Sequence, residues 1–183
     1  MVYTGIGSRR TPIEVCGAMT DLAHLLREHC LKLRSGGAEG ADTAFEVGSR
    51  REKEIYINEN GSRGKYHNGF NIALDRLPNE VQEHCYRKAS GVHPGWERCD
   101  DWAKSMHARN ILQIEGLNGI HTDFVVYWTE YDKDFLPKGG TATAVKYAVS
   151  LGIPTFNLNI PAAVEQLGVF LLENYGIEYK GKL

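Results

Sequence analysis

The sequence predicts an α/β fold with a doubly wound parallel sheet and an inserted helical segment. Three observations predict it. Short apolar stretches alternate with amphipathic helical segments, which is the pattern of parallel strands joined by helical crossovers. Glycine-rich turns follow such stretches at residues 5–7 and 36–37 and precede a helical segment at 139–140. The stretch 122–128 is almost continuously apolar, as expected for a strand buried on both faces.

The first third of the chain alternates strand and helix twice before a third strand. Residues 11–14, Thr-Pro-Ile-Glu, have the form of a capping box with proline at the first helical position. Apolar residues then recur at helical spacing, so one face of this helix belongs to the core. The elements expected in this part are strands at 1–5, 31–34 and 54–57 and helices at 11 to about 29 and 38–51.

An inserted segment is expected at about 58–117. Residues 58–66 are rich in Asn, Gly, Ser, Arg and Lys, which predicts an exposed loop. Helices are predicted at 78–87 and 99–116, with a loop at 90–94 between them. Long connections in compact domains are usually functional or disordered, and the many aromatic and histidine side chains here argue against disorder. We therefore expect the segment to cover a site.

The remaining elements complete a Rossmann-like sheet. They are a strand at 122–128, a loop at 129–138, a helix at 140–151, a strand at 153–157 and a closing helix at 162–175. With right-handed crossovers, a strand order near 3-2-1-4-5 places the loops after strands one, two and four at one edge, around the topological switch point. All three glycine turns are then expected to face one cleft, within a single domain that spans residues 1–183.

The amino-acid composition and net charge narrow the classes of molecule that this protein is expected to bind. The 183 residues are 42% hydrophobic and 24% charged, which is ordinary for a globular domain. The formal net charge of −2 gives no global basic field, so a nucleic acid is not expected as a partner. The chain begins directly with strand-like residues, and no apolar run approaches the ~20 residues that cross a bilayer. We expect no membrane partner and a cytoplasmic location.

Cysteine and histidine spacing does not predict a metal site. The four cysteines form no C-x-x-C pair, so free thiols in a reducing compartment are expected. The seven histidines show no H-E-x-x-H or related spacing. We interpret His93 and His107 as hydrogen-bonding residues of a pocket or of the core. Neither a metal nor another cofactor is expected.

The closing helix predicts self-association as a dimer or larger homo-oligomer. Its apolar residues exceed what one face can bury: Val164, Leu167, Val169, Phe170, Leu171 and Leu172. The alternative is that the helix packs entirely on its own sheet, with Phe170 and Leu171 flanking the buried stripe. Light scattering at micromolar concentration distinguishes the two.

The stretch 33–42 is the strongest candidate for ligand binding, because it predicts a strand that runs through Gly36 and Gly37 into a helix. Glycines let the backbone come close to a ligand, and the first amides of a helix lack intrahelical acceptors and carry partial positive charge. A phosphate is therefore expected above these glycines. Such a turn is also common as a plain connection, but its recurrence at 5–10 and 139–143 favours the binding interpretation.

Four motifs together resemble the SLOG superfamily. They lie at residues 3–9, 35–42, 106–110 and 139–143, and the similarity spans residues 1 to about 157. This superfamily joins the DprA (Smf) recombination mediators, the LOG nucleotide phosphoribohydrolases and nucleotide-sensing domains of bacterial immune systems. The form with the His-Pro insertion most resembles small bacterial and bacteriophage DprA-like proteins. The resemblance implies a nucleotide or nucleotide-sugar ligand in a bacterial cell, with the gene carried by the cell or by a phage.

The resemblance leaves catalysis open. LOG enzymes carry a Pro-Gly-Gly-x-Gly-Thr-x-x-Glu motif whose glutamate is thought essential for cleaving the base from ribose phosphate. The corresponding stretch here is 138–146, and Lys146 occupies the glutamate position. The arginine of the family's other catalytic motif corresponds to Arg109. Glu39 or Asp42 could replace the missing carboxylate, whereas an ammonium beside an oxocarbenium-like sugar has the wrong sign for catalysis.

Arginine and tryptophan side chains supply further candidate contacts. Arg109 suits bidentate phosphate binding, with a surface salt bridge to Glu115 or Asp101 as the alternative. Trp128, at a strand end, could stack on a base. Trp96 could do the same or could pin the insertion to the body of the protein.

We compare three functions. The leading hypothesis is binding of a nucleotide or nucleotide-derived signalling molecule through the three glycine loops, which in a phage would suit sequestration in an anti-defence role. The alternatives are an N-glycoside hydrolase acting on nucleoside 5′-monophosphates or related nucleotide sugars, and DprA-like single-stranded DNA binding. No catalytic residue is assigned. The candidate ligand-binding residues are Gly5, Gly7, Ser8, Arg9, Ser35, Gly36, Gly37, Glu39, Gly40, Asp42, His93, Trp96, Arg109, Asn110, Trp128, Gly139, Gly140, Thr141 and Thr143.

Overall fold

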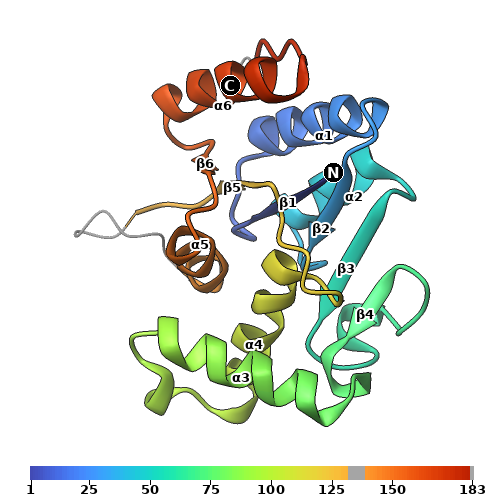
Figure 1. The fold of residues 1–183 in the computed structure, drawn as a ribbon, viewed down its shortest axis with the longest axis vertical. Coiled ribbons are helices and arrows are strands. Elements are labelled where there is room, and N and C mark those ends of the chain that lie inside the picture. The colour runs from blue at the N-terminus through green and yellow to red at the C-terminus, as the bar shows by residue number, and fades with distance from the viewer. Residues whose placement is uncertain (132–138, 182–183) are drawn as a thin grey trace.

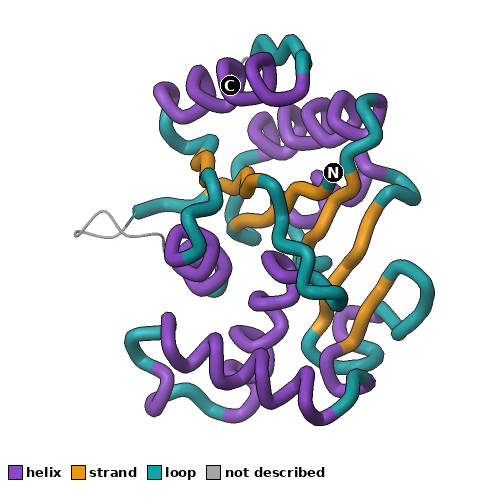
Figure 2. The backbone as a smooth tube through the Cα atoms, in the orientation of Figure 1, coloured by secondary structure: helices purple, strands orange, loops and turns teal. Residues whose placement is uncertain are grey.

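The computed structural model describes residues 1–131 and 139–181, and within them six strands form one parallel sheet (Figures 1 and 2). The strands are β1 (Val2–Gly7), β2 (Lys32–Ser35), β3 (Lys53–Ile57), β4 (Asn71–Ala73), β5 (Phe124–Trp128) and β6 (Thr155–Asn157). Their order across the sheet is β4-β3-β2-β1-β5-β6, and every neighbouring pair is parallel. The predicted doubly wound α/β fold is confirmed.

Helices cover both faces of the sheet (Figure 1). They are α1 (Ile13–Glu28), α2 (Ala41–Ser49), α3 (Asn79–Val92), α4 (Asp101–Glu115), α5 (Thr141–Ser150) and α6 (Pro161–Tyr175), with short 3-10 turns η1 (Ser62–Gly64), η2 (Leu74–Arg76) and η3 (Trp96–Arg98). One core joins α1, α2 and α6 to one face of the sheet. The other joins α3, α4 and α5 to the opposite face. Successive side chains of a strand point to opposite faces of the sheet, so Tyr3 of β1 lies in the first core and Ile6 of β1 lies in the second.

The inserted segment forms part of the sheet and of the hydrophobic core, and does not serve only to cover a site. It adds the edge strand β4, which the sequence analysis missed because three residues are too short to show a period. Helix α3 continues to Val92 and so includes part of the loop expected at 90–94. Helix α4 packs on β2 and β3, with Ala108, Ile111 and Ile114 fully buried. It is therefore the helix that carries the chain back toward β5.

Two helices begin differently from the sequence prediction. The expected capping box at 11–14 does not form: Pro12 precedes α1 without a side-chain cap, and the Thr11 hydroxyl donates to the Ser8 carbonyl at 2.7 Å. The hydroxyl thus closes the loop after β1 instead of capping the helix. Helix α2 starts at Ala41, not at residue 38, because Gly40 has φ +79° and interrupts helical geometry.

The closing helix α6 buries Val164, Leu167 and Leu171 against the sheet. Phe170 is half-buried and contacts the ring of Phe124 with centroids 5.3 Å apart. Val169 and Leu172 are exposed. Self-association stays a prediction that light scattering checks, and it now involves a smaller apolar surface than the sequence implies. Among the described residues, no helix has both the length and the apolar character that crossing a bilayer requires.

Candidate functional site

A cavity of about 950 Å³ lies at the carboxyl-terminal edge of the sheet. Its wall includes residues that follow β1, β2 and β5, and Gly7 of β1 is paired with Trp128 of β5 at this edge. Between these two strands the chain changes direction across the sheet, which is where open α/β folds bind ligands. The volume lies within the range of about 300–1,000 Å³ that is usual for small-molecule sites. All three glycine loops therefore contribute to one cavity.

Cations outnumber carboxylates on the cavity wall. Among the described wall residues, the cationic side chains are Arg9, Arg10, Arg63, Arg109 and Lys146, and the carboxylates are Glu39 and Asp42. The whole protein has a formal net charge of −2, so this positive charge is local to the cavity. Such a distribution favours an anionic ligand.

Arg109 is the most buried of these cations, with 4% exposure. Its Nη1 donates to the Tyr56 carbonyl at 3.2 Å, and its buried Nε has no hydrogen-bond partner within the described residues. The alternative salt bridge with Glu115 or Asp101 is absent from the described part of the chain, where Glu115 instead pairs with His84 at 2.7 Å. Burial lowers the pKa of Arg109 to about 10, so the guanidinium is charged at neutral pH. The charged guanidinium group belongs to the cavity wall, where it favours an anion.

Asp42 ties the first two loops together. Its Oδ1 accepts from the backbone N–H of Gly7 at 3.0 Å, and its Oδ2 accepts from Ala38 at 3.2 Å. The side chain is almost fully buried. Burial raises its pKa from the ordinary value of 3.8 to about 6, against the opposing effects of Arg109 and the two amides. Both carboxylate oxygens are engaged with the backbone, so Asp42 holds the loops in place.

The raised pKa of Asp42 predicts a particular pH dependence of stability. A carboxyl whose pKa is higher in the folded state stabilises the fold below its unfolded value near 3.8, and this contribution disappears as pH rises through about 6. The unfolding free energy of wild type relative to Asp42→Asn is therefore expected to fall between pH 4 and pH 7. Urea denaturation of both proteins across this range measures it, and a constant difference would contradict the assignment.

The third loop is fastened to α4 by two side chains. Asn110 Nδ2 donates to the Gly140 carbonyl at 2.8 Å, and Thr143 Oγ1 is 2.8 Å from His107 Nδ1. These bonds place the N-terminus of α5, with its partial positive charge, on the cavity wall. Part of the loop predicted at 129–138, namely 132–138, lies outside the described residues.

The cavity gathers most, but not all, of the predicted ligand-binding residues. Those on its wall are Gly7, Ser8, Arg9, Glu39, Asp42, His93, Arg109, Asn110, Gly139, Gly140, Thr141 and Thr143. Those that the described wall does not include are Gly5, Ser35, Gly36, Gly37, Gly40, Trp96 and Trp128.

The glycines of the second loop are closely packed and lie off the described cavity wall, so a phosphate directly above them stays a prediction. Gly36 and Gly37 are buried. A Cβ on Gly36 would overlap Arg109 Nη1, and one on Gly37 would lie 2.8 Å from both Ile55 and Lys65. Gly5 is likewise close to the ring of Phe45, at 2.6 Å from such a Cβ. These glycines let side chains approach the backbone, and of Gly36 and the Arg109 that it accommodates, only Arg109 lies on the cavity wall.

The two tryptophans proposed for base stacking lie elsewhere. Trp128 is 7% exposed and belongs to the core between the sheet and α1, α2 and α6. Trp96 packs edge-on against Tyr86 and His93, with Lys104 Nζ 5.9 Å from its ring centroid. These three partners all belong to the insertion, so the ring contacts hold parts of the insertion together and do not test whether Trp96 pins it to the body of the protein. Trp102, 55% exposed on the cavity wall, is the tryptophan that a base could contact.

Sequence reasoning missed a face of α4. The further wall residues on this helix are Trp102, Ala103, Met106 and Gln113, beside His107, which the sequence analysis had already assigned to a pocket or to the core. They recur three or four positions apart and share a face with Asn110. Extending this spacing from the predicted Asn110 would have identified them. Arg63, on η1, carries no comparable sequence signal.

Two histidines of the wall meet a cysteine beside the cavity. His93 and His107 have ring centroids 4.1 Å apart, and Cys99 Sγ lies 4.0 Å from His93 Nδ1. Burial lowers the pKa of His107 to about 4, with His93 and Arg109 acting in the same direction. Burial, together with Lys146 and Arg98, also lowers the pKa of His93. Both imidazoles are therefore neutral near pH 7.

The fold and the site define a Rossmann-like α/β protein with a cationic cavity at the switch point of its parallel sheet. No protein-family model matches the sequence, and no curated protein matches it either. Among solved structures, the chain is similar to DNA processing protein A from Helicobacter pylori, which is described by its unique single-stranded DNA binding mode. The TM-score is 0.49 at 14% identity, over 98% of this chain and 74% of that one.

One expectation of the sequence analysis is corrected. A nucleic acid was excluded there because the chain has no global basic field. That exclusion does not hold, because the cavity wall concentrates cations that the net charge conceals; the similar protein is itself described as binding single-stranded DNA. The local positive charge of the cavity also shows why net charge was a poor guide: a wall with five cations can lie in a protein of net charge −2.

Proposed function

We propose that this protein binds a nucleotide or nucleotide-derived molecule in the cavity at the switch point, with the phosphate beside Arg109. The observation that carries the proposal is a buried, charged arginine on a cavity wall rich in cations. Phosphate accepts hydrogen bonds from the planar guanidinium group with matching geometry. The exposed face of Trp102 supplies a surface for the base. The protein retains the ligand, as a sequestering protein would.

Calorimetric titration with AMP, GMP, CMP and UMP tests the proposal, with Gly140→Val as the diagnostic variant. A Cβ at Gly140 would meet no atom within 4 Å, so the fold tolerates the change while the side chain enters the ligand's space. Gly17→Val is the matched control, because a Cβ there also meets nothing within 4 Å and α1 lies on the other face of the sheet. Affinity is expected to fall only in Gly140→Val. Absence of binding by wild type to all four nucleotides, or equal affinities in the two variants, contradicts the site.

Replacing Arg109 with alanine should weaken nucleotide binding by about 10- to 150-fold. This range corresponds to the roughly 1.5–3 kcal/mol of a charge-assisted hydrogen bond. The matching nucleoside lacks phosphate, so its affinity should change little. Arg109→Lys, which keeps the charge but not the forked geometry, should fall between wild type and Arg109→Ala. Equal losses for nucleotide and nucleoside would show that Arg109 does not contact phosphate.

Hydrolysis is expected to be inefficient. Lys146 lies on the cavity wall, where its ammonium opposes the positive charge that develops on the sugar as the base departs. Asp42 is engaged by two amides, which leaves Glu39 as the wall carboxylate without a hydrogen bond or salt bridge in the described chain. Chromatography of free bases after incubation with nucleoside monophosphates measures turnover. Release at the usual enzymatic rate of about 1–10³ per second that disappears in Glu39→Gln would identify a hydrolase.

A single DNA strand is the second ligand class to test, since a strand also presents phosphates to a cationic wall. Arg9, Arg10 and Arg63 are exposed on that wall and could contact successive phosphates. Titration of an oligonucleotide at two salt concentrations separates the ligands. Binding that weakens steeply with salt and that Gly140→Val leaves unchanged would favour a strand on the rim over a nucleotide in the cavity.

A further inference from the structure

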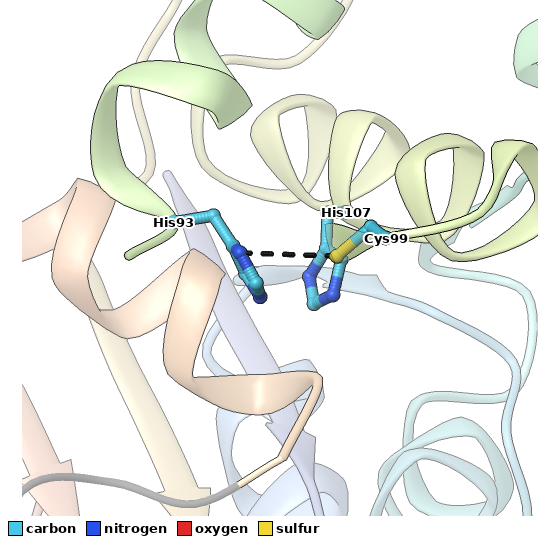
Figure 3. A group of neighbouring side chains, drawn as sticks. All are labelled: His93, Cys99 and His107. Carbon is cyan, nitrogen blue, oxygen red and sulfur yellow. Dashed lines mark hydrogen bonds between the residues drawn. The ribbon is translucent and has the colours of Figure 1, made fainter. Parts of the chain in front are cut away.

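We propose that His93, Cys99 and His107 form a zinc site beside the main cavity. The three residues come from different parts of the insertion: His93 ends α3, Cys99 follows η3 and His107 lies within α4. Figure 3 shows their side chains pointing toward one another. One ligand atom from each lies within 4.8 Å of the other two. Two imidazoles and one thiolate are a donor set that Zn²⁺ prefers.

The spacing of the donor atoms is close to what a zinc ion requires. Zinc binds nitrogen at about 2.0–2.1 Å and thiolate at about 2.3 Å, so tetrahedral ligands lie about 3.3–3.6 Å from one another. Cys99 Sγ is 4.0 Å from His93 Nδ1. That nitrogen accepts from the Gly95 N–H at 3.2 Å, so it carries a lone pair, and a zinc ion bound there would replace this hydrogen bond. A side-chain movement of about half an ångström would bring this sulfur and nitrogen to the bonded spacing.

The surroundings of His107 resemble a metal site's supporting shell. Thr143 Oγ1 is 2.8 Å from His107 Nδ1. A histidine that ligates zinc through one nitrogen usually donates its other N–H to an oxygen, and this bond fixes the ring. With Nδ1 engaged by Thr143, Nε2 is the nitrogen left for the metal. The same threonine belongs to α5, so the bond also connects the site to the third glycine loop.

A zinc ion here would keep one position open toward the cavity. The three protein ligands leave a fourth site in tetrahedral geometry, and His93 and His107 both lie on the cavity wall. An oxygen of water or of a phosphate group would complete the coordination. The ion with its thiolate carries a net charge of +1 and so adds to the cations already on this wall. The site stands on its own geometry and does not depend on nucleotide binding.

Cobalt titration of the reduced, chelator-stripped protein tests the proposal, since Co²⁺ reports zinc-type sites through its spectrum. Wild type is expected to bind one equivalent, with a thiolate-to-cobalt charge-transfer band and the strong d–d bands of four-coordinate Co²⁺, and Zn²⁺ should abolish both. Cys99→Ser should lose the charge-transfer band. Cys30→Ser is the control, because Cys30 is an exposed free thiol in the turn after α1, and it should keep the band.

Two results would overturn the zinc site: wild type without the charge-transfer band, or Cys99→Ser with the band intact. In both cases the cluster is a hydrogen-bonded group, in which Cys99 Sγ donates to the Gly95 carbonyl at 3.5 Å. Thr143→Val supplies a second measurement. Loss of the supporting bond to His107 should weaken zinc affinity by about 10- to 100-fold while the charge-transfer band persists. Unchanged affinity would remove His107 from the set of ligands.

Discussion

Arg34→Ala is expected to lower the free energy of unfolding by about 3–5 kcal/mol, as is usual when one partner of a buried ion pair is removed. The Arg34 side chain is 2% exposed and its Nε pairs with Glu54 at 2.9 Å. Its Nη1 donates to the Ile120 carbonyl at 2.6 Å and to that of Ile114 at 3.4 Å. The residue thus joins β2 and β3 to the end of α4, and its loss leaves buried acceptors unsatisfied.

Lys32→Ala is the matched control, because Lys32 pairs with the same Glu54 carboxylate at 2.8 Å but is 41% exposed. Exposed pairs contribute about 0–1 kcal/mol. Urea denaturation of the two variants should therefore separate them by several kcal/mol. Similar losses in both would mean that burial of Arg34 does not set its contribution.

Gly36→Val is expected to remove both stability and nucleotide affinity, because it displaces Arg109. The new Cβ would overlap Arg109 Nη1 and Gln113 Nε2. With its amide oxygen turned inward, Gln113 accepts from Gly36 N at 3.2 Å and also from Arg109 Nη1, so the three residues form one packed unit. Overpacking a buried position costs about 1–3 kcal/mol and occasionally more. The expected loss is about 3 kcal/mol, with nucleotide affinity reduced as in Arg109→Ala.

A double-mutant cycle identifies the cause. In an Arg109→Ala background the space beside Gly36 is larger, so Gly36→Val should cost less stability there than in wild type. It should also cause no further loss of nucleotide affinity. The two effects would be additive if Gly36 acted through the backbone of its own loop, as the sequence analysis expected. Urea denaturation and calorimetric titration of the four proteins distinguish these outcomes.

The sequence by itself determined the α/β class, the alternation of elements and the edge of the sheet where the site lies. These depend on local signals: the apolar run that becomes β5, the helical period of α1 and the glycines after β2. The turn expected at 5–7 does not form there, because Gly5 and Gly7 belong to β1 and pair with β5. Right-handed crossovers then fix which loops share an edge. The cavity accordingly combines loops that are more than 100 residues apart, such as those at Gly7 and Gly140.

The tertiary structure alone decided what each candidate residue does. Gly36 and Trp128 carry the sequence signals of a phosphate loop and a stacking ring, yet one makes room for Arg109 and the other packs in the core. Such roles are set by how deeply a residue is buried and by which side chains surround it, and neither property follows a periodic pattern in the sequence. His93, Cys99 and His107 show the same limit, because their irregular spacing becomes a cluster only when η3 turns the chain back between α3 and α4. The candidate site is formed by contacts between segments that are distant along the chain, and local sequence patterns do not predict such contacts.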